Sequence, residues 1–195
     1  VGEWVADPGA SGGKQMVAMQ LRVHPTLIPE AKAIAQVDGV LNAVMINASG
    51  VGELLLVGPG AGSRPTASAV MADVISVARA LAGNEQPSIY SMGVGVSALS
   101  QPVIADINEV SSAWYLRLDA EDKPGVMAAL TQCLSQNGIG IESLIQKPES
   151  AGLAKVPVIL LTDEAPTRAI ELAIADIEAL PSVGGPVTCL RVENF

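Results

Sequence analysis

Cysteine, aromatic residues and positive charge are all scarce in this sequence. The 195 residues include two cysteines, too few for a disulfide framework or a four-ligand zinc site, so we expect a reducing, cytoplasmic setting. Aromatic residues make up 3% and charged residues 16%, whereas 49% are hydrophobic, which argues against intrinsic disorder. The net charge of −9 argues against nucleic acid as a partner. No run approaches ~18 uninterrupted apolar residues, so no membrane span is expected.

The first half of the chain alternates short apolar segments with turn residues. We expect strands at 16–23 and over a hairpin at 40–57, because each apolar run ends in proline, glycine or asparagine. Apolar residues then recur at helical spacing from Val70 to Leu81, and Gly83 follows them as a stop. Residues 83–112 lose this order and read as a linker with one short strand around Val103. The first domain is therefore predicted at 1–105.

A glycine-rich loop joins the expected hairpin to the expected helix. Gly60, Ala61 and Gly62 have little or no side chain, so their backbone can approach a ligand, and the helix that follows points N–H groups at it. A tight strand-to-helix turn explains the same pattern, and local evidence favours that explanation. Ser63 stands where a dinucleotide fingerprint would have its last glycine, so this is not a Rossmann phosphate loop.

The second half predicts six elements in the order β-α-β-β-α-β. Residues 114–120 alternate apolar and polar side chains, as a half-buried strand does, and 165–180 carry an apolar stripe at helical spacing. This order over about 80 residues is the ferredoxin-like arrangement. The fold class predicted for the whole chain is α+β (mixed α/β): an α/β sheet region followed by this ferredoxin-like domain at 113–195.

A second loop, between the strand and the helix of that domain, suits a free amino acid. Asp122 offers a carboxylate to an ammonium group, and Gly125 and Val126 offer N–H groups at a helix N-terminus to a carboxylate. An ordinary helix cap, with aspartate before the helix and proline in its first turn, explains the same residues and is favoured on local evidence.

The remaining candidates carry less chemistry. His24 is the single histidine, and no cysteine or acidic pair stands near it, so the sequence favours a strand-end residue over a metal ligand and supplies no Ser-His-Asp triad. Cys133 lies on the apolar stripe of a helix and Cys189 lies in a strand, so we expect both thiols in the core.

Five segments of the chain carry a recognisable pattern. They are LRVHPTLIP at 21–29, VDGVLNA at 37–43 and GAGSRPTASAVMADV at 60–74, then DKPGVM at 122–127 and NGIGIES at 137–143. The first three resemble homoserine dehydrogenase, a likeness that covers about 16–82. The last two resemble an ACT domain, a small amino-acid-sensing module, over about 113–193.

The resemblance implies the C-terminal part of an enzyme that reduces aspartate semialdehyde to homoserine with NAD(P)H. Gly62 then matches a loop glycine near the nicotinamide, with Gly60 and Ala61 beside it, while the cofactor fingerprint and catalytic lysine of the family cannot be placed in this chain. Asn137 and Ile139 of a neighbouring ACT module would close an effector pocket on Asp122, Gly125 and Val126. The implied partners are a second copy of the chain, in a dimer through the ACT domains, and an amino acid, threonine first.

An alternative function stays open at this stage. The chain would then be a stand-alone amino-acid-binding regulatory or dimerisation module with a vestigial first domain. The residues that read the cofactor ribose are not present, so the choice between NAD and NADP is undetermined.

Overall fold

The computed structural model describes residues 2–6, 17–83, 97, 101–146 and 155–194. The chain forms two compact units, of which one joins Val1–Ile28 to Pro102–Phe195 and the other is Pro29–Gln101. These units reflect which residues lie close together in space, and they do not test the predicted domains. The division into domains at 1–105 and 113–195 stays a prediction.

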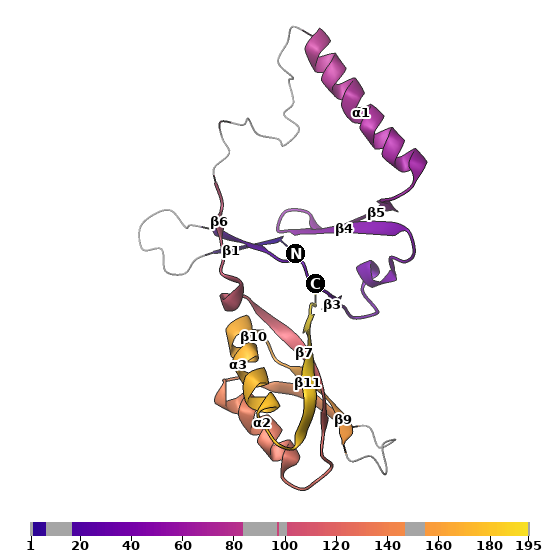
Figure 1. Ribbon diagram of the computed structural model, residues 1–195. Helices are drawn as coiled ribbons and strands as arrows, with labels where there is room; N and C mark the ends of the chain where they lie inside the picture. Colours follow the sequence, from indigo (N-terminus) through magenta and orange to yellow (C-terminus); the bar gives the residue numbers. More distant parts are fainter. Residues whose placement is uncertain (1, 7–16, 84–96, 98–100, 147–154, 195) are drawn as a thin grey trace. The chain divides into compact units, whose positions relative to one another are not determined.

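The first of these units, here called the C-terminal unit, has the predicted element order in its part from Pro102 onward. The mixed α/β fold class is confirmed. Its sheet runs β3-β11-β7-β9-β8, with the two-residue β10 paired to β7 (Figure 1). All pairings are antiparallel except that of β3 with β11. The elements are β7 (Ser111–Ala120), α2 (Val126–Gln136), β8 (Ile141–Gln146), β9 (Val156–Thr162), β10 (Ala165–Pro166), α3 (Thr167–Glu178) and β11 (Val183–Val192).

One face of this sheet carries the core of the unit. Every second residue of β7 from Ser112 to Ala120 is buried, as period-2 alternation predicts for a strand covered on one face. The inward side chains of β7 and β9 join the apolar stripes of α2 and α3 in one cluster. Its fully buried large residues include Leu116, Leu130, Leu134, Leu160, Ile170 and Ile177.

The N-terminal strands of this unit pair with segments far along the chain. Strand β1 (Gly2–Ala6) runs antiparallel to β2 (Val17–Leu21), and β2 runs parallel to β6 (Val103–Ile104), where the sequence predicted a short strand. Strand β3 (Thr26–Leu27) extends the main sheet at β11. A 3-10 turn, η3 (Ile107–Glu109), leads into β7.

The other unit holds a hairpin and one long helix. Strands β4 (Leu41–Ala48) and β5 (Gly52–Pro59) pair in register, which confirms the expected hairpin, and α1 (Ser63–Ala82) follows the glycine-rich loop. The 3-10 helix η1 (Ala33–Gln36) precedes the hairpin. None of the residues described in 29–83 is buried.

Helix α1 is long and apolar enough to cross a membrane by length and composition alone, and none of its most apolar window is buried. Uninterrupted apolar runs do not reveal it, because Arg64, Asp73 and Arg79 break the run. A core helix of a larger soluble protein has the same composition, so a single such helix is weak evidence of a span.

Candidate functional site

The glycine-rich loop meets α1 through a backbone conformation that favours glycine. Gly62 is the N-cap residue of α1, with φ of +123° and ψ of 149°, a region that side chains with a Cβ rarely enter. A Cβ built on Gly62 lies 3.4 Å from the Cδ atom of Pro65, an ordinary contact, so the constraint is the backbone angle rather than crowding. The first helical hydrogen bond runs from the N–H of Thr66 to the carbonyl of Gly62 at 3.1 Å.

Gly60 is constrained differently. A Cβ at this position would overlap the side-chain amide of Asn42 on β4, so a substitution at Gly60 would displace that amide. Gly60, Ala61 and Gly62 are all exposed. The arrangement presents small residues and a helix N-terminus to the outside, which suits a polar or anionic ligand. Their assignment to a cofactor stays a prediction.

The second loop caps α2 in a similar way. Gly125 is the N-cap residue, with φ of +91° in the left-handed region, and nothing lies within 4 Å of a Cβ built on it. The N–H of Val126 already donates to the carbonyl of Lys123 at 3.2 Å, and the Val126 side chain is buried in the core. The exposed Lys123 ammonium, 2.9 Å from Glu121, lowers the pKa of that carboxyl.

Asp122 keeps part of its carboxylate open to a ligand. Its Oδ1 atom accepts a hydrogen bond from Nε2 of Gln146, the last residue of β8, at 3.0 Å. Gln146 therefore orients the carboxylate through Oδ1, and an ammonium group would bind to the other oxygen. This feature was not visible in the sequence, because it depends on β8 returning beside the loop.

Asn137 and Ile139 lie at the other end of α2. Eleven residues of helix separate the two ends by about 16 Å, so a single chain does not bring these two residues to Asp122. Ile139 is 4% exposed and its N–H donates to Leu134 at 3.0 Å. The Nδ2 group of Asn137 donates to the carbonyl of Cys133 at 2.9 Å and to Asp176 at 3.0 Å, which leaves its amide oxygen. The proposed effector role of both residues stays a prediction.

Sequence reasoning missed a buried polar cluster between β7, α3, β11 and the segment that follows β2. The Nη1 atom of Arg191 donates to the Ser112 hydroxyl at 2.7 Å and Nη2 donates to the Thr167 hydroxyl at 2.6 Å. Its guanidinium also lies 4.2 Å from the ring centroid of Trp114. Burial lowers the pKa of Arg191, and the neighbouring Arg22 lowers it further. The available signal was that Arg191 shares a strand face with Cys189, which we expected in the core; its position opposite Trp114 is seen only in the structure.

Arg22 completes this cluster from the N-terminal segment. Its Nη1 atom lies 2.7 Å from the Glu193 carboxylate and donates to the Ser112 hydroxyl at 3.1 Å, and its side chain is 2% exposed. Ser112 therefore accepts from both arginines. The cluster and the β3–β11 pairing attach residues 22–27 firmly to the main sheet.

The remaining candidates have structural surroundings. His24 Nδ1 lies 2.9 Å from the hydroxyl of Thr26, and Cys133 is buried, as expected. Cys189 is half-buried at the edge of the core, and burial raises the pKa of its thiol to about 11. No group of three metal-ligating side chains occurs among the described residues.

Two family models match the chain on either side of the linker. Homoserine dehydrogenase matches residues 7–75 and the ACT domain matches residues 114–179. The chain is 46% identical over 176 residues to homoserine dehydrogenase of Pseudomonas aeruginosa and 41% identical over 177 residues to that of Neisseria gonorrhoeae. These alignments cover 90% and 91% of this chain, but only 41% and 40% of the relatives.

The solved structures agree. The crystal structure of a homoserine dehydrogenase from Thiobacillus denitrificans superposes with a TM-score of 0.80 at 41% identity, and covers 91% of this chain and 39% of its own. The chain thus spans about two fifths of the relatives it matches. This chain matches the C-terminal part of homoserine dehydrogenases and carries their ACT domain.

Proposed function

We propose that the chain is the C-terminal portion of a cytoplasmic homoserine dehydrogenase, which reduces aspartate semialdehyde to homoserine with NAD(P)H. The observation that carries this proposal is the 46% identity to a homoserine dehydrogenase along 90% of the chain. The reduced nicotinamide supplies the hydride in such an enzyme. The chain's own contribution is the loop of Gly60, Ala61 and Gly62, whose exposed backbone at a helix N-terminus fits close approach to a cofactor.

This portion alone is expected to lack dehydrogenase activity. The sequence has no Gly-x-Gly-x-x-Gly fingerprint, and the catalytic lysine implied by the resemblance cannot be placed in it. The exposed apolar side chains of α1, including Val70, Met71 and Val74, support packing against further chain in the whole enzyme. Purified chain assayed with aspartate semialdehyde and NADPH should give no turnover above the uncatalysed rate. Turnover comparable to an intact homoserine dehydrogenase would contradict the proposal.

The glycine loop is tested in the intact enzyme. Gly62→Val forces a branched side chain to φ of +123°, so we expect a raised KM for the cofactor or loss of turnover while the protein remains soluble. Gly58→Val is the matched control, because Gly58 has no positive φ and nothing lies within 4 Å of its Cβ. Unchanged cofactor kinetics in Gly62→Val would show that the loop is a turn and nothing more.

We further propose that the ACT domain binds an amino acid as a feedback signal, with threonine the first candidate and isoleucine or methionine next. Asp122 would hold the ammonium group, and the backbone of Gly125 and Val126 would hold the carboxylate. ACT domains are amino-acid-binding regulatory domains that often oligomerise, which supports a second copy of the chain as a partner.

Calorimetry on the 195-residue chain tests the effector. Asp122→Asn removes the charge but keeps an oxygen for the hydrogen bond from Gln146, so threonine binding should weaken at least about tenfold without loss of the fold. Asp38→Asn makes the same charge change at an exposed site in the other unit and should leave binding unchanged. Binding that survives Asp122→Asn would place the effector elsewhere. No heat with millimolar threonine, isoleucine or methionine would contradict the sensing role.

A further inference from the structure

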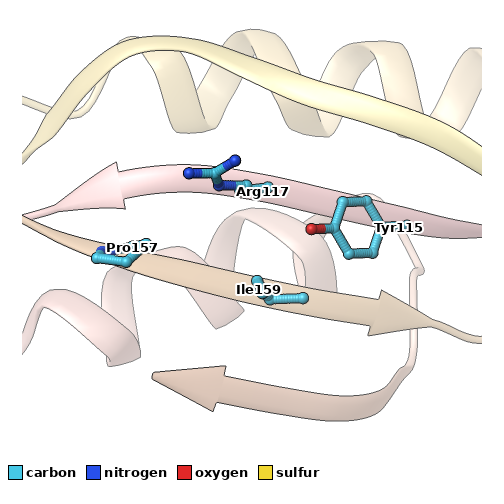
Figure 2. Close-up of a pocket in the computed structure, with 4 residues that line it drawn as sticks. All are labelled: Tyr115, Arg117, Pro157 and Ile159. Carbon is cyan, nitrogen blue, oxygen red and sulfur yellow. The ribbon is translucent and has the colours of Figure 1, made fainter. Parts of the chain in front are cut away.

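The main sheet of the C-terminal unit has one face that none of the unit's described helices covers. Core residues of α2 and α3 pack against the inward positions of β7 and β9, so the alternate positions point the other way. Figure 2 shows Tyr115 and Arg117 of β7 with Pro157 and Ile159 of β9 on this outward face, with the helices behind the strands. These four residues line a shallow pocket of about 260 Å³. We call this surface the open face.

Apolar side chains surround the pocket on the open face. By register, Tyr115 lies opposite Leu161 and Leu190, and Ile159 lies opposite Ile145. Ile145 is 49% exposed, and the other three apolar residues are partly exposed. A contiguous apolar patch of this kind on a folded unit marks a contact surface.

Two opposite charges stand next to each other along the centre of the open face. Arg117 and Asp119 occupy successive outward positions of β7, and both are exposed. Within the described part of the chain, neither side chain takes part in a hydrogen bond or an ion pair. The face therefore offers one cation and one anion whose charges are not neutralised by a close partner.

This arrangement is self-complementary. If a second copy stacks on the open face with its β7 antiparallel, a two-fold axis level with residue 118 sets each Arg117 over the partner's Asp119, and the same rotation sets Ile159 over the partner's Pro157. Stacked sheets lie about 10 Å apart, a distance that an arginine and an aspartate side chain span together. An isologous contact makes every favourable pair twice.

We propose that a second copy of this chain docks on the open face, sheet to sheet, so that Arg117 of each copy pairs with Asp119 of the other. The inference rests on the self-association proposed above and names its surface. The loop of Asp122 and Gly125, at the end of β7, stays open to the effector. Because α2 packs on the other face of the sheet, this contact does not bring Asn137 and Ile139 to the partner's loop.

Sedimentation equilibrium of the 195-residue chain at 1–100 μM tests the surface. Wild type should sediment at twice 19.9 kDa. Arg117→Asp and Asp119→Arg should each raise the dimer dissociation constant at least about tenfold, because each puts like charges together twice. The double variant Arg117→Asp with Asp119→Arg restores the pairing and should return the dissociation constant to within about threefold of wild type. Circular dichroism confirms that each variant folds.

Arg168→Asp is the matched control, because it makes the same charge change on the exposed surface of α3. It should leave the dissociation constant unchanged, and an effect as large as that of Arg117→Asp would overturn the proposal in favour of net charge. A wild-type monomer would overturn the self-association and the surface together. A wild-type dimer that survives Arg117→Asp, or single-variant losses that the double variant fails to restore, would overturn the open face alone and leave the enzyme assignment and the effector proposal standing.

Discussion

The two compact units differ in where their apolar residues lie. In the C-terminal unit, inward residues of two strands meet the stripes of two helices and form one buried cluster. In the described residues of 29–83, hairpin and helix form with regular backbone hydrogen bonds, yet no side chain is buried. Isolated hairpins and single helices are marginal in water, because most of their stability comes from packing. Regular secondary structure alone therefore does not make a region an independent folding unit.

The largest expected contrast between the units comes from deleting buried volume. Leu116 is fully buried in β7, so Leu116→Ala should lower the free energy of unfolding by about 2–5 kcal/mol. Leu81→Ala, at a position 83% exposed on α1, should change it by less than about 0.5 kcal/mol. Urea unfolding followed by circular dichroism measures both. Equal losses would show that α1 shares a core with the rest of the chain.

A smaller contrast comes from the buried polar cluster. Arg191→Met removes the donor to the Thr167 hydroxyl, one of the two donors to the Ser112 hydroxyl, and the cation over Trp114, so we expect a loss of about 2–4 kcal/mol. Arg168→Met removes an exposed arginine 3.4 Å from Glu109 and should cost no more than about 0.5 kcal/mol. The same urea titration separates them. Indistinguishable midpoints would mean that the buried cluster contributes nothing to stability.

The two helix-capping glycines sharpen the comparison further. Gly125 and Gly62 both have positive φ, and neither has a close clash waiting for a Cβ. Gly125→Ala should cost about 1–2 kcal/mol of cooperative unfolding free energy, because the strain falls inside a folded unit. Gly62→Ala should leave that transition in place, since α1 has no buried contact to lose with it. A matching loss in both variants would argue that the units unfold as one.

The smallest effect is a pH dependence from Cys189. Burial raises the pKa of its thiol to about 11, above the ordinary value of 9.0 for a cysteine. Between these two values the unfolded chain releases the thiol proton while the folded chain keeps it, so the unfolded state binds fewer protons and stability falls as pH rises from 9 to 11. Thermal unfolding midpoints should decline over this range, and Cys189→Val should decline less steeply. Parallel slopes would show that the Cys189 thiol does not contribute.

The sequence predicted those features that depend on neighbouring residues. Alternation in 114–120 gave β7, the apolar stripe of 165–180 gave α3, and glycine followed by proline gave the start of α1. Each of these signals is local, because strand and helix periodicity arise from backbone geometry within a few residues.

The missing features all depend on long-range contacts. Arg22 and Glu193 are 171 positions apart, and no local pattern links them, so neither the buried cluster nor the β3–β11 pairing was foreseen. The hydrogen bond between Gln146 and Asp122 was missed for the same reason. At the candidate site, the residue types of both loops could be predicted from the sequence. The positive φ of Gly62 and Gly125, and the hydrogen bond that already occupies the N–H of Val126, could be seen only in the folded backbone.

Native-state hydrogen exchange on the 195-residue chain tests the contrast between the two units most directly. Amides of β7, β9, α2 and α3 should exchange only through global unfolding and share one large protection factor. Those of α1 should exchange at rates close to those of an isolated helix in water, with small protection factors. That result would establish a self-contained C-terminal unit beside elements that need further chain to bury them. Protection of α1 amides equal to that of β7 would contradict the account.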